Sequence, residues 1–417
     1  MSNPMNEKTL LSALDIGTTK ICAVIGEYDR STSEYHIRGI GKVPSAGMKG
    51  GVVIDIDQMS RCIENAVKEA LKQAGLDKIN GVIIGIAGDH IRSHDTEHAI
   101  PINRPDNSKK INVIDERDIV RLEESVKNIN IGIDREIIHV IAQEYIINDQ
   151  MIVKNPIGMS GNKLTLKANI ITAAINNARD LVNCVQKTGL NVYDIVLEPI
   201  ASAESVLTYD QKDLGVCLID IGGGTTDITI FRDGHLVSTN IVGLGGEIIT
   251  RDIASLVQTS FMEAERIKKQ YGWATAKQAK AEGIREFYVK PVNGRTDIAL
   301  NSLILSEFIE ARLREIFLMA QKHIRSQRLN AGIVLAGGGA LLNGIDHLAE
   351  EMFSMNCLIG YPRHLNGLEK ENYTPDYATA IGLLYSANKP HLKPRFPSGQ
   401  SKMTLWNKIK ERLSEFF

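Results

Sequence analysis

Two short stretches place carboxylates, glycines and hydroxyls in the same order along the chain. The first reads Asp15-Ile-Gly-Thr-Thr-Lys20 and the second reads Asp220-Ile-Gly-Gly-Gly-Thr-Thr-Asp227. A glycine has no Cβ, so the backbone N–H groups around it can approach an anion closely. Threonine hydroxyls can donate further hydrogen bonds to phosphate oxygens. These residue types therefore point to phosphate binding.

The carboxylates in these stretches need a cation between themselves and a phosphate, because like charges repel. Asp15 and Asp220 can hold Mg²⁺ through its water molecules, and the ion can then bridge to the β- and γ-phosphates of a nucleotide. A third glycine turn, Gly337-Gly338-Gly339, offers bare backbone against which a nucleoside could lie. One such turn alone is more often an ordinary hairpin, and Asp15 alone could cap its own turn. Three turns in this order predict a nucleotide-binding site.

The elements that must position these turns also occur twice. Residues 11–26 and 214–231 each read as two apolar, β-rich runs joined by the glycine–threonine turn. Helix and strand patterns follow each unit, for example a helical pattern at 57–74 that Gly75 ends. The sequence therefore predicts two copies of one α/β domain that face each other across a cleft. One hairpin from each copy would clamp the triphosphate.

Length and composition limit the remaining function classes. A chain of 417 residues is expected to form two or more domains. The net charge of −2 gives no electrostatic reason to expect a nucleic-acid partner. The five cysteines are scattered without metal-ligand spacing, which favours reduced thiols over a zinc site. Because we find neither a signal peptide nor a run of ~20 apolar residues, we expect a cytoplasmic body.

The last fourteen residues, 404–417, read as an amphipathic helix behind a proline-rich stretch, 388–403, which we predict to be a flexible linker. Spacings of four, four and three put its apolar residues on one face, namely Leu405, Trp406, Ile409, Leu413, Phe416 and Phe417. Its basic residues are Lys408, Lys410 and Arg412. At ~20 Å the helix is too short to span a bilayer. We expect it to lie in the surface of an anionic membrane, and docking on the protein's own body is the alternative.

The order of the motifs resembles that of a known superfamily. DIGTTK, LEPIASA, DIGGGTTD and AGGG resemble the phosphate-1, connect-1, phosphate-2 and adenosine motifs of the actin, sugar kinase and heat-shock chaperone superfamily. Within it, the chain resembles the bacterial cell-division protein FtsA family from about residue 10 to 417. The segments that carry this closer resemblance are 41–53, 139–149, 154–161, 214–228 and the terminal LWNKIKERLSEFF.

The resemblance implies an α/β, actin-like fold. Two duplicated ribonuclease-H-like domains would surround a nucleotide cleft, with an FtsA-type inserted subdomain and a C-terminal amphipathic helix. The implied parts are subdomain IA (1–85 and 168–208), the SHS2-like subdomain IC (86–167), subdomain IIA (209–257 and 319–387), subdomain IIB (258–318), the flexible linker (388–403) and the membrane-targeting helix (404–417).

The resemblance also implies roles for individual residues. Those that would bind the β- and γ-phosphates are Asp15, Gly17, Thr18, Thr19 and Lys20. The opposing half of the clamp would be Asp220 with Gly222, Gly223, Gly224, Thr225 and Thr226. Gly337, Gly338 and Gly339 would contact adenosine, and Glu265 and Lys268 would lie near the ribose. Asp15 and Asp220 would hold Mg²⁺ through water.

Glu198 of LEPIASA has two interpretations. In chaperone and filament relatives this position carries the group that orients the attacking water. Hydrolysis needs such a group in addition to the metal ion and the hydrogen-bond donors to the phosphates. Glu198 could equally be a carboxylate that caps a helix beginning near Pro199. Hydrolysis of ATP, if present, is expected to be slow and regulatory.

The function implied by the resemblance is that of a structural adaptor. An ATP- and Mg²⁺-binding protein would self-associate into filaments and tether FtsZ to the cytoplasmic face of the inner membrane at the division septum, as a peripheral protein. Subdomain IIB would receive a C-terminal peptide of FtsZ, with 290–295 as a candidate surface, and subdomain IC would help to recruit later division proteins. Many tails on one polymer would raise its avidity for lipid.

Three alternatives belong to the same superfamily. A small-molecule kinase would need a second substrate pocket and a catalytic base, and we identify neither. A chaperone-type ATPase would need a substrate domain after the last nucleotide motif, where few residues remain. An actin-like assembly ATPase of a pilus or secretion system would fit the body, but the amphipathic tail argues against it.

Overall fold

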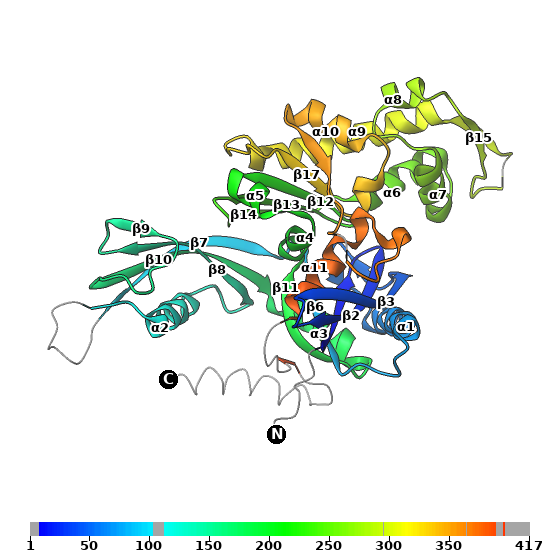
Figure 1. The fold of residues 1–417 in the computed structure, drawn as a ribbon. Helices are drawn as coiled ribbons and strands as arrows, with labels where there is room; N and C mark the ends of the chain where they lie inside the picture. Colours follow the sequence, from blue (N-terminus) through cyan, green and yellow to red (C-terminus); the bar gives the residue numbers. More distant parts are fainter. Residues whose placement is uncertain (1–7, 103–111, 295, 364, 389–394, 397–417) are drawn as a thin grey trace.

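The computed structural model describes residues 8–102, 112–388 except 295 and 364, and 395–396. These residues form two five-stranded sheets, a four-stranded sheet that projects to one side, and a helical lobe at the far end of the second five-stranded sheet (Figure 1). The α/β, actin-like class predicted from the sequence agrees with this architecture.

The first five-stranded sheet has the order β11-β6-β1-β2-β3. Its first three strands in the chain form an antiparallel meander, and β6 and β11 run parallel to β1. Every residue of β6 is buried, as expected for a parallel strand covered on both faces. The bounds are β1 Lys8–Ile16, β2 Lys20–Asp29, β3 Glu34–Pro44, β6 Gly81–Ile86 and β11 Asn191–Leu197, with a small β4–β5 hairpin at Met48–Lys49 and Val52–Val53.

The second five-stranded sheet repeats this topology in the order β14-β13-β12-β17-β18. Here β12, β13 and β14 form the meander, and β17 and β18 run parallel to β12. The duplication predicted from the two glycine–threonine turns is therefore confirmed. The bounds are β12 Val216–Ile221, β13 Thr226–Arg232, β14 His235–Val242, β17 Ile333–Ala336 and β18 Cys357–Ile359.

Helices α4 (Glu198–Val206) and α11 (Ala378–Ser386) lie between the two sheets, at the centre of Figure 1. A Cβ at Gly382 would lie 1.7 Å from the Ala201 carbonyl oxygen, so these helices can cross this closely only at a glycine. They position the two halves of the molecule relative to each other.

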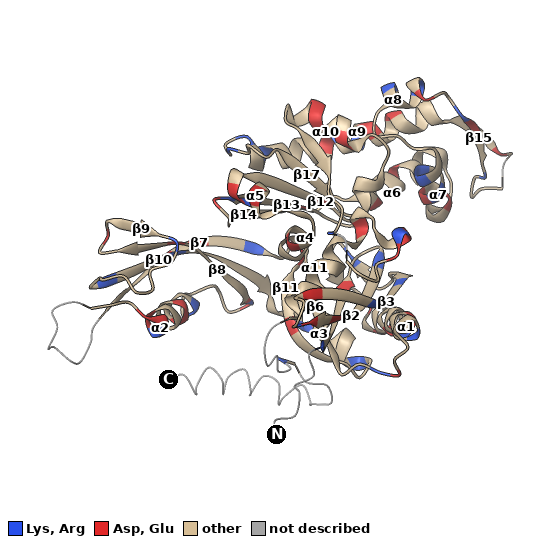
Figure 2. Ribbon diagram, viewed as in Figure 1, with Lys and Arg blue, Asp and Glu red and all other residues tan. Residues whose placement is uncertain are grey.

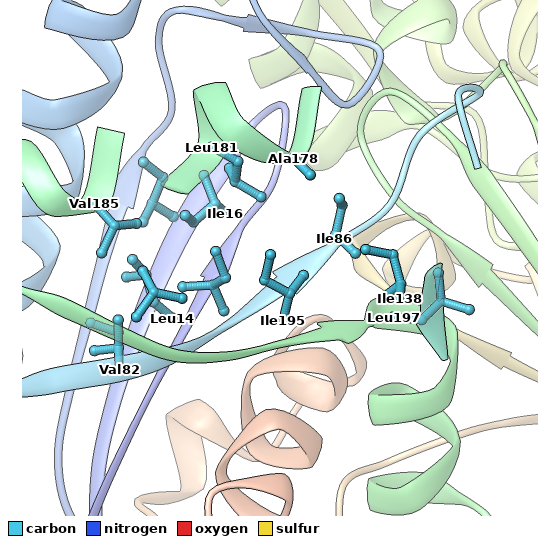
Figure 3. Close-up of a cluster of buried hydrophobic side chains, with 14 of the residues drawn as sticks. Leu14, Ile16, Val82, Ile86, Ile138, Ala178, Leu181, Val185, Ile195 and Leu197 are labelled. Atoms are coloured by element: carbon cyan, nitrogen blue, oxygen red, sulfur yellow. The ribbon is translucent and has the colours of Figure 1, made fainter. Parts of the chain in front are cut away.

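The outer face of the first sheet is covered by α1 (Ile56–Ala74) and α3 (Ile175–Lys187). Helix α1 begins where the Asp55 side chain accepts a hydrogen bond from the Gln58 N–H, and Gly75 ends it with φ of 64°. This agrees with the predicted helix. Figure 3 shows the core beneath α3, where side chains of β1, β6 and β11 meet those of the helix.

The outer face of the second sheet is covered by helices that share one core. They are α6 Gly246–Val257, α9 Ser302–Ile324 and α10 Ile345–Phe353. The remaining short elements of this half are α5 Tyr209–Leu214, η1 Gly338–Leu341, η2 Lys370–Asn372 and η3 Pro375–Tyr377.

The projecting sheet, with the order β7-β10-β8-β9, is the predicted subdomain IC. Helix α2 (Glu116–Lys127) packs on it through Leu122 and Val126, and the helix also carries acidic and basic residues (Figure 2). The strand bounds are β7 Arg92–Pro101, β8 Arg135–Ile147, β9 Met151–Val153 and β10 Lys163–Ala174. The predicted boundary between 167 and 168 falls inside β10, because that strand continues along the same sheet to Ala174.

The helical lobe is formed from the range that we predict to be subdomain IIB, 258–318. It contains α7 Phe261–Tyr271, α8 Ala276–Ala281 and the hairpin β15 Glu286–Val289 and β16 Ile298–Asn301. Helix α9 then leads back to the second sheet, and it passes through the predicted boundary at 318 without a break.

The end of the chain differs in part from its prediction. The predicted membrane helix, 404–417, lies outside the described residues. Within the predicted linker, however, Arg395 and Phe396 are described, and Phe396 is buried against β11. Among the described residues, no helix combines the length and the apolar character needed to cross a membrane.

Candidate nucleotide-binding site

The first turn joins β1 to β2 and carries Thr18 and Thr19. Gly17 closes it by donating its N–H to the Lys20 carbonyl oxygen at 2.9 Å. The Lys20 ammonium lies 2.5 Å from a carboxylate oxygen of Asp15, which is itself buried. Burial alone would lower the pKa of Lys20, but the Asp15 charge and the hydrogen bond raise it above its ordinary value. The turn thus holds a charged ammonium beside two hydroxyls.

The second turn repeats this geometry between β12 and β13. Gly222 donates its N–H to the Thr225 carbonyl oxygen at 2.9 Å. The N-terminus of α6 is attached to the same turn, because Gly246 and Glu247 donate their N–H groups to the carbonyl oxygens of Gly222 and Gly223, each at 2.9 Å. A helix N-terminus carries a partial positive charge, so this turn also lies in a field that favours anions.

The tips of the two turns touch each other. A Cβ at Gly223 would lie 2.3 Å from Cγ2 of Thr19, and a Cβ at Gly224 would lie 2.6 Å from Oγ1 of Thr18. The second and third glycines are therefore required by the close approach of the opposite hairpin. The two predicted phosphate turns are thus in direct contact in this structure.

The third turn lies beside the end of β12. Gly337 has φ of +79°, and a Cβ there would lie 2.2 Å from Oδ1 of Asp220. A Cβ at Gly339 would lie 2.3 Å from the Ile221 side chain, whereas Gly338 meets nothing closer than 3.9 Å. The structure thus brings the predicted adenosine turn against the second glycine–threonine turn.

Glu198 is the first residue of α4, directly after β11, and its side chain packs against Gly85. No side-chain hydrogen bond caps this helix, and its N-cap is Leu197. Burial raises the pKa of Glu198 well above its ordinary value, and the charges of Asp15 and Asp227 raise it further. This carboxyl therefore lies close enough to the aspartates of both hairpins to interact with their charges.

Asp227 ends the second motif, and the sequence pattern predicted no separate role for it. It is paired with Asp220 across the β12–β13 ladder, at the position that Cys22 occupies opposite Asp15 in the first hairpin. Its side chain is buried, and Oδ1 has no hydrogen-bond partner. Burial, and then the charge of Asp220, raise the pKa of Asp227 well above its ordinary value.

Burial likewise raises the pKa of Asp220. Among the described residues, the two hairpins and α4 therefore bring the carboxyl groups of Asp15, Asp220, Asp227 and Glu198 near one another, with Lys20 paired to Asp15. A divalent ion with its water shell fits this donor set, since water molecules can bond to an unpartnered buried carboxylate oxygen. In the described part of the chain, no three His, Cys, Asp or Glu side chains are grouped as direct metal ligands.

A buried polar contact connects the central helices to this site. Ser202 of α4 donates its hydroxyl proton to Oδ2 of Asp220 at 2.6 Å, and its oxygen lies 2.9 Å from the Thr379 hydroxyl of α11. Within LEPIASA the sequence offers only a small polar residue at this position. It does not indicate the partners, because they are distant in the chain. A second link between the halves joins Lys42 of β3 to Asp376 of η3 at 2.5 Å.

Glu265 and Lys268 of α7 form an ion pair at 2.6 Å beside the second turn. Lys268 also donates to the Gly246 carbonyl oxygen at 3.0 Å and to the Thr250 hydroxyl at 2.7 Å. The predicted ribose residues are therefore attached to the same helix N-terminus as the second glycine–threonine turn.

Subdomain IC also reaches the site. The Leu197 N–H, one residue before Glu198, donates to Nε2 of His139 in β8 at 3.0 Å. Figure 3 shows the neighbouring Ile138 packed beside Leu197 and Ile86. The start of α4 is thus fixed partly by the inserted subdomain, a contact that no local sequence pattern indicated.

The predicted FtsZ surface is described in part. Lys290 directly follows β15, and its carbonyl oxygen accepts a hydrogen bond from the Thr259 hydroxyl at 2.8 Å. Val292 is exposed and donates its N–H to the Gln258 carbonyl oxygen, while Arg295 lies outside the described residues. This stretch is therefore attached to the end of α6.

Comparisons with known proteins agree with the motif order. A family described as "Cell division protein FtsA" matches residues 217–382, and one described as "SHS2 domain inserted in FTSA" matches residues 88–172. The chain is 39% identical to the cell division protein FtsA of Neisseria meningitidis, over 92% of this chain and 91% of that protein. It is 33% identical to the protein of the same name from Escherichia coli K12, over 93% and 92%. The chain belongs to the FtsA family.

Solved structures of other proteins share the fold. A type IV pilus biogenesis complex, PilM–PilN, superposes with a TM-score of 0.64 at 15% identity, over 91% of this chain and 99% of that chain. A structure of MreB 5 of Spiroplasma citri bound to AMPPNP gives 0.50 at 14% identity, over 99% and 100%. These likenesses concern the fold alone, whereas the relationship to FtsA extends to sequence over nearly the whole chain. The SHS2 match also includes 168–172, which agrees with the unbroken β10.

Proposed function

We propose that this member of the FtsA family binds ATP with Mg²⁺ between its two glycine–threonine turns and acts as a membrane-attached adaptor for FtsZ. The observation that carries the nucleotide part is the contact of Thr18 and Thr19 with the glycines of the opposite hairpin. Hydrogen-bond donors from both halves of the molecule then lie close together. A nucleotide bound between them would contact both halves, so its binding would be coupled to their relative arrangement.

The roles proposed for the chain's own residues follow from their positions. The backbone N–H groups and threonine hydroxyls of both turns would bind the phosphates, and Lys20 would exchange part of its contact with Asp15 for phosphate oxygen. Asp15, Asp220 and Asp227 would accept hydrogen bonds from the water shell of Mg²⁺. The positive charge of the ion would offset the repulsion between the negatively charged phosphates and these carboxylates. Glu198 would hold a water molecule near the γ-phosphate, for a slow hydrolysis.

The proposed adaptor role requires both the folded body and the C-terminal tail. We propose that the 404–417 helix binds the cytoplasmic face of the inner membrane at the division septum, that subdomain IIB receives FtsZ, and that subdomain IC serves later division proteins. Self-association would place many weak membrane helices on one polymer, so that later attachments become intramolecular. The membership in the FtsA family and the apolar face of the tail support this proposal.

Replacing Leu413 with glutamate tests the membrane part. We expect Leu413→Glu to abolish co-sedimentation with vesicles of phosphatidylglycerol and phosphatidylcholine, because a charge would enter the apolar face that inserts between headgroups. The matched control is Ser414→Glu, which adds the same charge on the polar face and is expected to reduce binding only several-fold. Equal binding of both variants would contradict an interfacial helix.

A further inference from the structure

Arg395 and Phe396, in the middle of the predicted linker, belong to the folded body. Phe396 is only 5% exposed and packs into the core of the first sheet together with Val192 and Leu190. A side chain of this size is buried at the edge of a sheet only where a matching apolar surface receives it. The stretch is therefore attached to the body at this point.

The backbone at this point extends the first sheet. The Val192 N–H donates to the Phe396 carbonyl oxygen at 2.9 Å, and the Phe396 N–H donates back to the Val192 carbonyl oxygen at 2.9 Å. This reciprocal pair is an antiparallel bridge on the outer side of β11, whose other side pairs with β6. An edge strand presents unpaired N–H and C=O groups, and a short extended segment can satisfy them in this way.

The side chain of Arg395 adds a polar contact that fixes the register. Its guanidinium lies 3.4 Å from Oδ1 of Asp194, on the same strand, and 5.3 Å from the centre of the Phe396 ring. The Arg395 N–H lies within 3.4 Å of the Tyr193 carbonyl oxygen. A shift by one residue would separate the charges and turn the ring away from the core.

We propose that the edge of β11 is a docking site for the chain's own Arg395–Phe396, and that this contact, the β11 clip, fixes the point at which the C-terminal segment leaves the body. Seven residues separate Phe396 from the 404–417 helix, and at ~3.5 Å each they reach at most about 25 Å. A chain free from residue 388 onward would reach roughly twice as far. The β11 edge is then the side of the body that faces the membrane.

The membrane orientation rests on the proposed function, whereas the clip itself does not. The amino-acid sequence offers a direct test of the clip with trypsin. Lys389 and Lys393 each precede a proline and resist trypsin, so the Arg395–Phe396 bond and the Lys402–Met403 bond are the cleavable sites of the linker. A protease cuts a hydrogen-bonded segment only when it opens, so the clip protects the first bond.

We expect trypsin to cut the full chain, without lipid, at least tenfold more slowly after Arg395 than after Lys402. Phe396→Ala should remove most of this difference, and Phe396→Leu should keep most of it, because leucine also fills an apolar site. The cut after Lys402 is the internal reference in every digest, and mass spectrometry of the fragments gives both rates. A synthetic peptide of residues 388–403, with and without each substitution, gives the intrinsic cleavage rates for comparison.

Equal cleavage of the two bonds in the unaltered chain would overturn the clip. The same digest on chain bound to phosphatidylglycerol vesicles tests the orientation, since the Arg395–Phe396 bond should stay protected there. Loss of protection only on vesicles would overturn the proposed orientation. A chain that stays protected but does not bind vesicles would refute the membrane part of the proposed function and leave the clip standing.

Discussion

Asp220→Asn is expected to weaken binding of ATP in the presence of Mg²⁺ by at least 100-fold, about 2.8 kcal/mol. Asp220 lies where the second turn, the third turn and α4 meet, since it contacts Ser202 and adjoins Gly337. Asparagine keeps the oxygen that accepts the Ser202 proton, so the ligand-free fold should survive. What it loses is the negative charge that would hold the hydrated ion. Isothermal titration with ATP, in Mg²⁺ and in EDTA, measures the effect.

The informative quantity is the difference between the two titrations. The unaltered protein should bind ATP much more tightly with Mg²⁺ than with EDTA, and Asp220→Asn should remove that difference. The matched control, Asp213→Asn on α5, changes an exposed aspartate far from the turns and should bind as the unaltered chain does. An undiminished Mg²⁺ effect in the Asp220 variant would place the ion elsewhere.

Glu198→Gln is expected to stabilise the ligand-free protein at neutral pH while it removes any ATP hydrolysis. Burial and the neighbouring Asp15 and Asp227 raise the folded-state pKa of Glu198 above its unfolded value. The folded state therefore binds this proton more tightly, and the resulting stabilisation is fully present below the unfolded pKa. It is lost as the pH rises through the folded pKa. Glutamine carries no such dependence.

The difference in the free energy of unfolding between the variant and the unaltered chain should therefore be larger at pH 8 than at pH 5. At pH 8 we expect the variant to be more stable by about 1 kcal/mol, the size of an ordinary stabilising substitution. Thermal unfolding at both pH values measures this. Glu282→Gln at the exposed end of α8 serves as the control and should change neither stability nor hydrolysis. A destabilised Glu198 variant with normal hydrolysis would mean that Glu198 serves only the local packing of α4.

The parts of this fold that could be predicted from the sequence are those that local residue patterns specify. The repeated Asp-Ile-Gly…Thr-Thr runs indicated two hairpins, and the structure places Gly17 and Gly222 in the same hydrogen-bonded turn. The helical pattern at 57–74 and the stop at Gly75 likewise located α1. Each of these signals lies within a few residues of the element that it specifies.

The contacts that complete the site could not be predicted in this way, because they join residues that are distant in the chain. Ser202 reaches Asp220 and Thr379 only after α4 and α11 pack between the sheets. His139 reaches Leu197 only after the inserted subdomain docks on the first sheet. Phe396 is a single apolar residue among prolines and charges, so no periodicity set it apart from the linker.

The most direct test of the proposed adaptor role is the sedimentation of FtsZ with phosphatidylglycerol vesicles in the presence of this protein and ATP–Mg²⁺. We expect FtsZ to enter the pellet with the full chain and vesicles, and to stay in solution when the chain ends at Pro397 or when vesicles are omitted. The adaptor role would be contradicted if the full chain itself bound the vesicles while FtsZ remained in the supernatant.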